Sequence, residues 1–127
     1  MANINHFQMI DNLKKDTRVT FKKGFLGLGS KIIYNTTQSK IKAYKKEYDT
    51  SVGEQILKTL SLSTTDVKAT EKFPQKDLGN YQLELFVSDD KQFLAVSLYR
   101  YEDLCYKPVM EQKVFEGKDA ERYAYLF

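Results

Sequence analysis

The sequence predicts an α+β fold: a small single domain, 1–127, with an antiparallel sheet of about five strands and two or three short helices packed on it. The strongest observation is alternation of apolar and polar residues over 81–101, interrupted by the polar group 88–91, which is typical of a β-hairpin. Apolar residues at helical spacing near 52–61 and 119–127 supply helices. The chain length is that of one domain, and no repeat or linker divides it.

The N-terminal part is predicted to begin with a helix over about 4–15, where isoleucine and phenylalanine recur near helical spacing. A strand follows over 18–23, in which Val19 and Phe21 alternate with basic or polar residues and leave one positive, solvated face. The three glycines within 24–31 then predict a turn or bulge.

A second strand over 31–35 would complete a hairpin with the first, and a polar loop follows at 36–39. Residues 40–48 fit two structures, because their isoleucine and tyrosines match a helix face whereas Ile41 and Ala43 alternate with lysines. The basic alternation continues the preceding pattern. We therefore interpret this segment as a strand.

The middle of the chain predicts a helix over about 52–61, because Ser51 and Glu54 have the spacing of a capping box before an apolar stripe. The Ser/Thr-rich segment 61–75 is predicted to be a connecting loop. The second hairpin strand, 92–101, is apolar on both faces, as expected of a central strand covered on two sides.

The C-terminal part predicts one further strand over 105–115, after a turn at 102–103. Pro108 lacks a backbone donor, which favours an edge position for this strand. Gly117 ends the strand, and the apolar spacing over 119–127 predicts a short helix packed on the sheet.

The formal net charge of +3 is unevenly distributed along the chain. Residues 1–60 contain eleven Lys/Arg and five Asp/Glu, a charge of +6, whereas residues 61–127 contain nine and twelve, a charge of −3. Such polarity can steer an anionic partner to one side of a molecule. Uneven solvated charge without a function is the simpler alternative.

Motifs of catalysis are absent from the sequence. Gly24 and Gly29 have the spacing of a phosphate loop, but Ser and Lys follow in reversed order at 30–31 without the required strand and helix, so a structural turn is favoured. His6 is the single histidine, and Cys105 is the single cysteine. Acidic pairs fall in predicted turns, where they stay solvated. We expect no enzyme, no cofactor and no metal site.

Basic and aromatic side chains interleave in the N-terminal half. Single-stranded nucleic acid is often held by such a combination, although the aromatic residues could equally be core and the lysines solvated strand faces. Lysine outnumbers arginine, which weakens the case for bidentate recognition. The candidate contact residues are Arg18, Lys22, Lys23, Phe25, Lys31, Lys40, Lys42, Tyr44, Lys45 and Lys46.

From these features we expect a non-catalytic binding protein that modulates a protein or nucleoprotein partner, a class that includes small accessory or inhibitor proteins of phages and mobile elements. Abundant tyrosine, a favoured interface residue, agrees with this class. One alternative is nucleic-acid binding through the basic half; another is an enzyme or ligand carrier, which would need a deep pocket. No signal peptide or membrane-spanning stretch is visible, so we expect a cytoplasmic protein.

Overall fold

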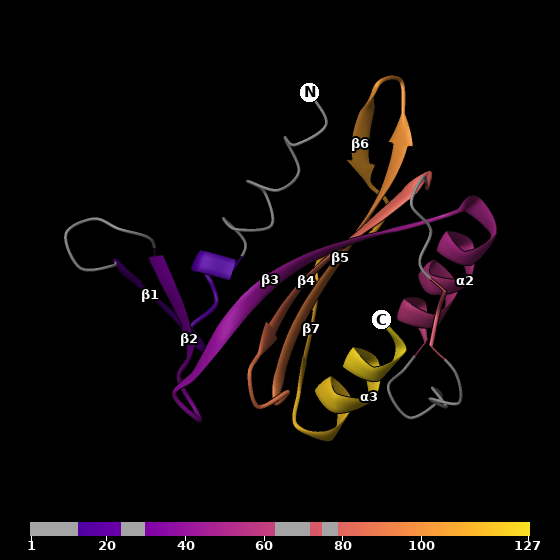
Figure 1. Cartoon of the computed structure of the whole chain (residues 1–127). Helices are drawn as coiled ribbons and strands as arrows, with labels where there is room; N and C mark the ends of the chain where they lie inside the picture. Colours follow the sequence, from indigo (N-terminus) through magenta and orange to yellow (C-terminus); the bar gives the residue numbers. More distant parts are fainter. Residues whose placement is uncertain (1–12, 24–29, 63–71, 75–78) are drawn as a thin grey trace.

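The computed structural model describes residues 13–23, 30–62, 72–74 and 79–127 (Figure 1). Within these residues seven strands form one sheet with two helices, so the expected sheet of about five strands was too small and the fold is richer in β-structure. The elements are β1 (Val19–Lys23), β2 (Ser30–Tyr34), β3 (Ser39–Tyr48), α2 (Thr50–Ser61), β4 (Tyr81–Ser88), β5 (Phe93–Glu102), β6 (Cys105–Pro108), β7 (Lys113–Glu116) and α3 (Lys118–Leu126).

The sheet is an antiparallel meander in which each strand pairs with the next one along the chain, from β1 to β6. The last strand, β7, pairs with β5 as well. It uses the first half of β5, whereas β6 uses the second half, so β6 and β7 lie end to end along one edge of β5. Figure 1 shows β7 leading directly into α3.

The predicted strand over 105–115 was wrong as one continuous element, because residues 109–112 separate β6 from β7. Pairing with β5 also shifts between the two strands: Tyr99 faces Pro108, but Val96, three residues earlier, faces Lys113. The intervening segment therefore holds two residues more than a continuous ladder allows. The proline ends β6 at the sheet edge, in agreement with its missing backbone donor.

Other predicted elements agree with the structure. The hairpin is β4 and β5, and the ambiguous segment 40–48 belongs to β3. Of the helix predicted over about 4–15, Leu13 and Lys14 are helical and Lys15 is in a turn, whereas residues 4–12 lie outside the described residues. The glycine turn at 24–29 and most of the loop predicted over 61–75 also lie outside them.

The N-cap of helix α2 lies two residues earlier than the sequence predicted. The side chain of Asp49, not Ser51, accepts a hydrogen bond from the backbone N–H of Val52, at 2.9 Å. The capping-box prediction was therefore wrong, because the acidic residue immediately after β3 already satisfies that donor. Gly53 then brings the helix against β4, where a Cβ atom would lie 2.2 Å from the ring of Tyr81.

The two faces of the sheet carry separate cores. Registered partners on neighbouring strands share a face, so Leu83 and Leu85 of β4 lie with Leu98 and Val96 of β5. Helices α2 and α3 cover this face, which we call the helix face. The opposite face has its own buried cluster: Leu13, Val19, Tyr34, Ile41, Phe86, Phe93 and Ala95. Strand β5 contributes to both clusters, which confirms that it is covered on two sides over its first seven residues; its last three residues are exposed.

Candidate functional site

Six of the ten predicted contact residues lie on the helix face of the sheet. Lys40, Lys42, Tyr44 and Lys46 alternate along β3, and the last three are registered with residues of β4 that belong to this face. Lys40 is registered with Ile33 of β2. Because Lys31 lies two residues from Ile33 and faces Lys22 of β1, the same face continues across the first three strands. We call this set the cationic face: Lys22, Lys31, Lys40, Lys42, Tyr44 and Lys46.

The cationic face is open because the helices pack mainly on β4, β5 and β7. Its first four lysines are all exposed, and Tyr44 is 46% exposed among them. The ammonium of Lys42 lies 3.4 Å from a carboxylate oxygen of Asp89. Both side chains of that ion pair are about half exposed, so its contribution to stability is small. The face as a whole therefore remains strongly positive.

Lys46 differs from the other lysines because it lies at the border with the covered half of the helix face and is half-buried. Burial lowers the pKa of Lys46 below its ordinary value, and the nearby charges of Lys72 and Lys91 lower it further. Among the described residues, none of these three lysines forms an ion pair. Within the described part of the chain, positive charge is therefore concentrated here without an ion-paired carboxylate.

A groove of about 590 Å³ opens at this border, between β3 and α3. We call it the border groove. Its apolar and aromatic lining comes from three elements and the C-terminal residue: Tyr44, Leu85, Val87, Ala124, Tyr125 and Phe127. Tyr125 is 44% exposed, which leaves aromatic surface accessible on the α3 side as well as on β3.

The charged lining of the border groove consists of the same three lysines with Asp90 and Glu121. Both carboxylates are engaged within the fold. The hydroxyl of Ser88 donates to Asp90 at 2.6 Å, and the side-chain amide of Gln92 donates to Glu121 at 2.5 Å. Burial acts to raise the pKa of Asp90, but hydrogen bonds, first that of Ser88, hold it below its ordinary value.

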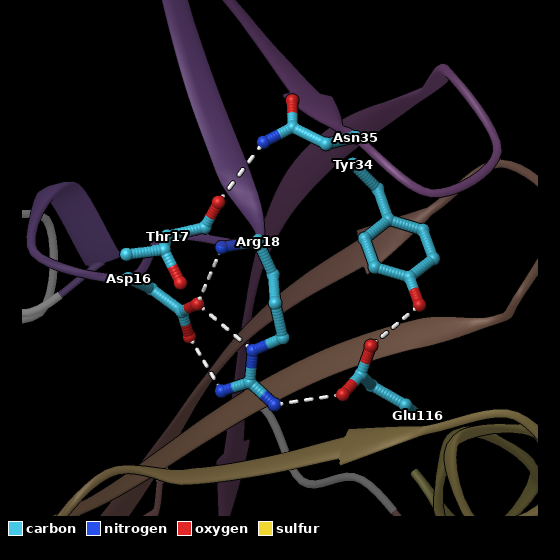
Figure 2. Close-up of polar contacts among 6 residues, drawn as sticks. All are labelled: Asp16, Thr17, Arg18, Tyr34, Asn35 and Glu116. Atoms are coloured by element: carbon cyan, nitrogen blue, oxygen red, sulfur yellow. Dashed lines mark hydrogen bonds and ion pairs between the residues drawn. The ribbon is translucent and has the colours of Figure 1, made fainter.

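Arg18 lies elsewhere, in a network that joins the start of β1 to the end of β7 (Figure 2). Its guanidinium donates to both carboxylate oxygens of Asp16, at 2.8 and 2.6 Å, and to Glu116 at 2.8 Å. The hydroxyl of Tyr34 donates to the second oxygen of Glu116 at 2.6 Å. Hydrogen bonds from Arg18 lower the pKa of Asp16; those from Tyr34 and then Arg18 lower the pKa of Glu116. Arg18 therefore holds strands together in this fold.

The remaining predicted contact residues do not join the cationic face. Lys45 points to the opposite face, where its ammonium lies 4.0 Å from the buried carboxylate of Glu84. Lys23 ends β1, and its side chain lies outside the described part of the structure. Phe25 also lies outside the described residues.

Sequence reasoning missed Lys72, Lys91 and Tyr125, which meet the strand lysines only through the fold. They come from a connecting segment, a turn and a helix, and no periodic pattern links them to β3. The separation of Lys45 from its neighbours was visible in the alternation of the strand, because successive side chains point to opposite faces.

Comparisons with known proteins returned no match: no family model fits the chain, and no curated protein or solved structure is significantly similar to it. In the described ranges no helix is long and apolar enough to cross a membrane. Those ranges also contain no group of three or more His, Cys, Asp or Glu side chains placed to hold a metal ion.

Proposed function

We propose that this chain is a non-catalytic binding protein whose cationic face takes an acidic surface of a partner protein. The observation that carries the proposal is the sheet register, which gathers five lysines and one tyrosine from three strands on a single open face. A positive surface of this kind attracts negatively charged partners over distances near the Debye length of about 10 Å and accelerates association.

Tyr44 supports a protein partner because it lies among the lysines and is accessible. Tyrosine combines a broad apolar ring with a hydroxyl, and it is enriched at protein interfaces while lysine is depleted from their centres. An interface centred on Tyr44, with Lys31, Lys40 and Lys42 at its rim, fits that pattern. The rim charges would then act mainly on the association rate and its salt dependence.

The proposal is tested by capture from a native lysate, with nuclease added, using the intact chain and two charge-matched variants. The face variant carries Lys31→Glu and Lys40→Glu. The control variant carries Lys58→Glu and Lys118→Glu, which changes exposed lysines of α2 and α3 by the same total charge. We expect a stoichiometric protein that the control variant retains and the face variant loses. Equal capture by both variants contradicts the assignment of the cationic face.

A second candidate function is the binding of single-stranded nucleic acid, favoured by one observation: Tyr44 lies between Lys42 and Lys46 on the same open face. Such a pattern combines charge for the backbone with a ring for base stacking. If this candidate function is correct, the material captured from lysate should be lost when nuclease is added. It also expects the affinity for an oligonucleotide to fall steeply with salt, and the same two variants distinguish specific binding from a general charge effect.

A further inference from the structure

The border groove concentrates three ammonium groups from separate parts of the chain. Lys46 comes from β3, Lys91 from the turn between β4 and β5, and Lys72 from the segment before β4. Burial first, and then repulsion by the charges of Lys72 and Lys91, lowers the pKa of Lys46. Asp90 and Glu121 also line the groove, but among the described residues no ion pair joins either carboxylate to these lysines. An anion placed among these groups would remove that repulsion, so charge complementarity favours an anionic ligand.

The rest of the groove is suited to a flat apolar body. Leu85 and Val87 of β4 and Ala124 of α3 present aliphatic surface, whereas Tyr44 and Tyr125 add partly exposed rings. Aromatic ligands stack on such rings and bury apolar surface against such aliphatic groups. The volume of about 590 Å³ lies within the range of about 300–1,000 Å³ that is usual for small-molecule sites.

We propose that the border groove binds a small aromatic phosphate ester of the nucleoside monophosphate class, with its phosphate among Lys46, Lys72 and Lys91 and its ring on the tyrosines. Phosphate fits better than carboxylate, because it offers three terminal oxygens to three ammonium donors. The two carboxylates in the lining accept hydrogen bonds from Ser88 and Gln92, and the three ammonium groups outnumber them in the groove. This site shares Tyr44 and Lys46 with the cationic face, but its ligand does not depend on the protein-binding role proposed above.

Isothermal titration calorimetry of the full chain tests the site with three kinds of probe: the four ribonucleoside monophosphates, each alone; the matching nucleosides; and inorganic phosphate. We expect at least one monophosphate to bind. Its nucleoside and inorganic phosphate should each bind at least tenfold more weakly, because the nucleoside lacks the phosphate for the lysines and inorganic phosphate lacks the ring for the tyrosines. Binding at equal strength by inorganic phosphate would reduce the groove to a general anion site and overturn the proposal.

Lysine variants test whether the monophosphate binds in the border groove. Lys46→Gln and Lys72→Gln should each weaken the monophosphate about tenfold to a hundredfold, which is the usual effect of losing one charged hydrogen bond. Lys58→Gln removes an exposed lysine of α2 outside the groove and should leave the affinity unchanged. Thermal unfolding of each variant is first compared with that of the native chain, to establish that the variant is folded. Unchanged affinity in a folded Lys46→Gln variant contradicts the site.

Two further outcomes separate this proposal from the others. A single-stranded oligonucleotide that binds while no monophosphate binds at millimolar concentration overturns it in favour of nucleic-acid binding. The Lys31→Glu and Lys40→Glu face variant should bind the monophosphate with native affinity, because neither residue lines the groove. Failure of protein capture therefore leaves the nucleotide result interpretable, and the reverse also holds.

Discussion

The two halves of the helix face differ in chemistry although they belong to one continuous sheet. Across the boundary between β3 and β4, Lys42 is registered with Val87 and Lys46 with Leu83. Helices α2 and α3 cover the β4 side and leave most of β3 open. The pair Tyr48–Tyr81 is the exception, because the chain turns into α2 there and both rings are buried. One step between strands thus separates core from charged surface.

The covered half of the helix face therefore contributes mainly to folding stability, whereas the open half is available for binding. Each leucine buried on the covered half contributes about 1.5–3 kcal/mol to folding. The exposed lysines of the open half add little to stability and remain available to a partner. The border groove is the place where apolar surface meets an excess of lysine over carboxylate side chains, and a small amphipathic anion is attracted to this combination.

The largest expected effect lies on the covered half. Leu83 is fully buried on β4, so Leu83→Ala should lower the free energy of unfolding by about 2–5 kcal/mol through lost burial and a cavity. The matched change on the open half, Lys40→Ala, should alter it by less than about 0.5 kcal/mol. Urea unfolding measures both. Similar decreases in the free energy of unfolding for the two variants would contradict the division between a covered half and an open half.

Gly53 tests how closely the covering helix must approach. A Cβ at this position would lie 2.2 Å from ring carbons of Tyr81, which is buried and has little room to move. Gly53→Ala should therefore destabilise by about 1–3 kcal/mol despite its better helix propensity. Ser51→Ala, on the exposed side of the same helix, is the control. It should be nearly neutral, because Asp49 provides the cap; a large loss there would restore the capping-box interpretation.

Strands β1 and β2, which carry part of the open half, are joined to β7 by the contacts of Arg18 and Tyr34 with Glu116. Acid should weaken these contacts. The folded pKa values of Asp16 and Glu116 lie below their ordinary values of 3.8 and 4.5. Their stabilisation is therefore fully present above the ordinary values and lost as pH falls through the lowered ones. Glu116→Gln should reduce stability by about 1 kcal/mol at pH 7.

Urea unfolding measured against pH checks this network. The difference in free energy of unfolding between the native chain and Glu116→Gln should shrink as pH falls below 4.5 and through the lowered pKa of Glu116, because the native carboxyl then takes up a proton. Glu111→Gln changes an exposed carboxylate in the segment before β7 and serves as the control. A difference that stays constant with pH would show that the ionised form of Glu116 contributes nothing to the fold.

Local sequence patterns predicted most of the strands, but they did not predict which residues from other segments lie beside those strands. Alternation was enough to identify β3 against its competing helical spacing, and it also separates Lys45 from Lys46. The division of the last predicted strand depends on its pairing with β5, which a single sequence does not reveal. Lys72 and Lys91 were missed for the same reason: neither is in a periodic segment, and the fold alone brings them to Lys46.

The smallest expected effect compares two neighbouring lysines. Lys46→Gln should leave the free energy of unfolding unchanged or raise it by up to about 0.5 kcal/mol, because burial and two nearby lysines oppose its charge. Lys45→Gln should instead destabilise, because it removes the cation beside the buried Glu84 carboxylate. Urea unfolding at low and moderate salt measures both. Added salt should stabilise the native chain more than Lys46→Gln, since it screens the repulsion that the variant lacks. Destabilisation by Lys46→Gln as large as that by Lys45→Gln would mean that Lys46 serves the fold, and its charge would then give no argument for a ligand.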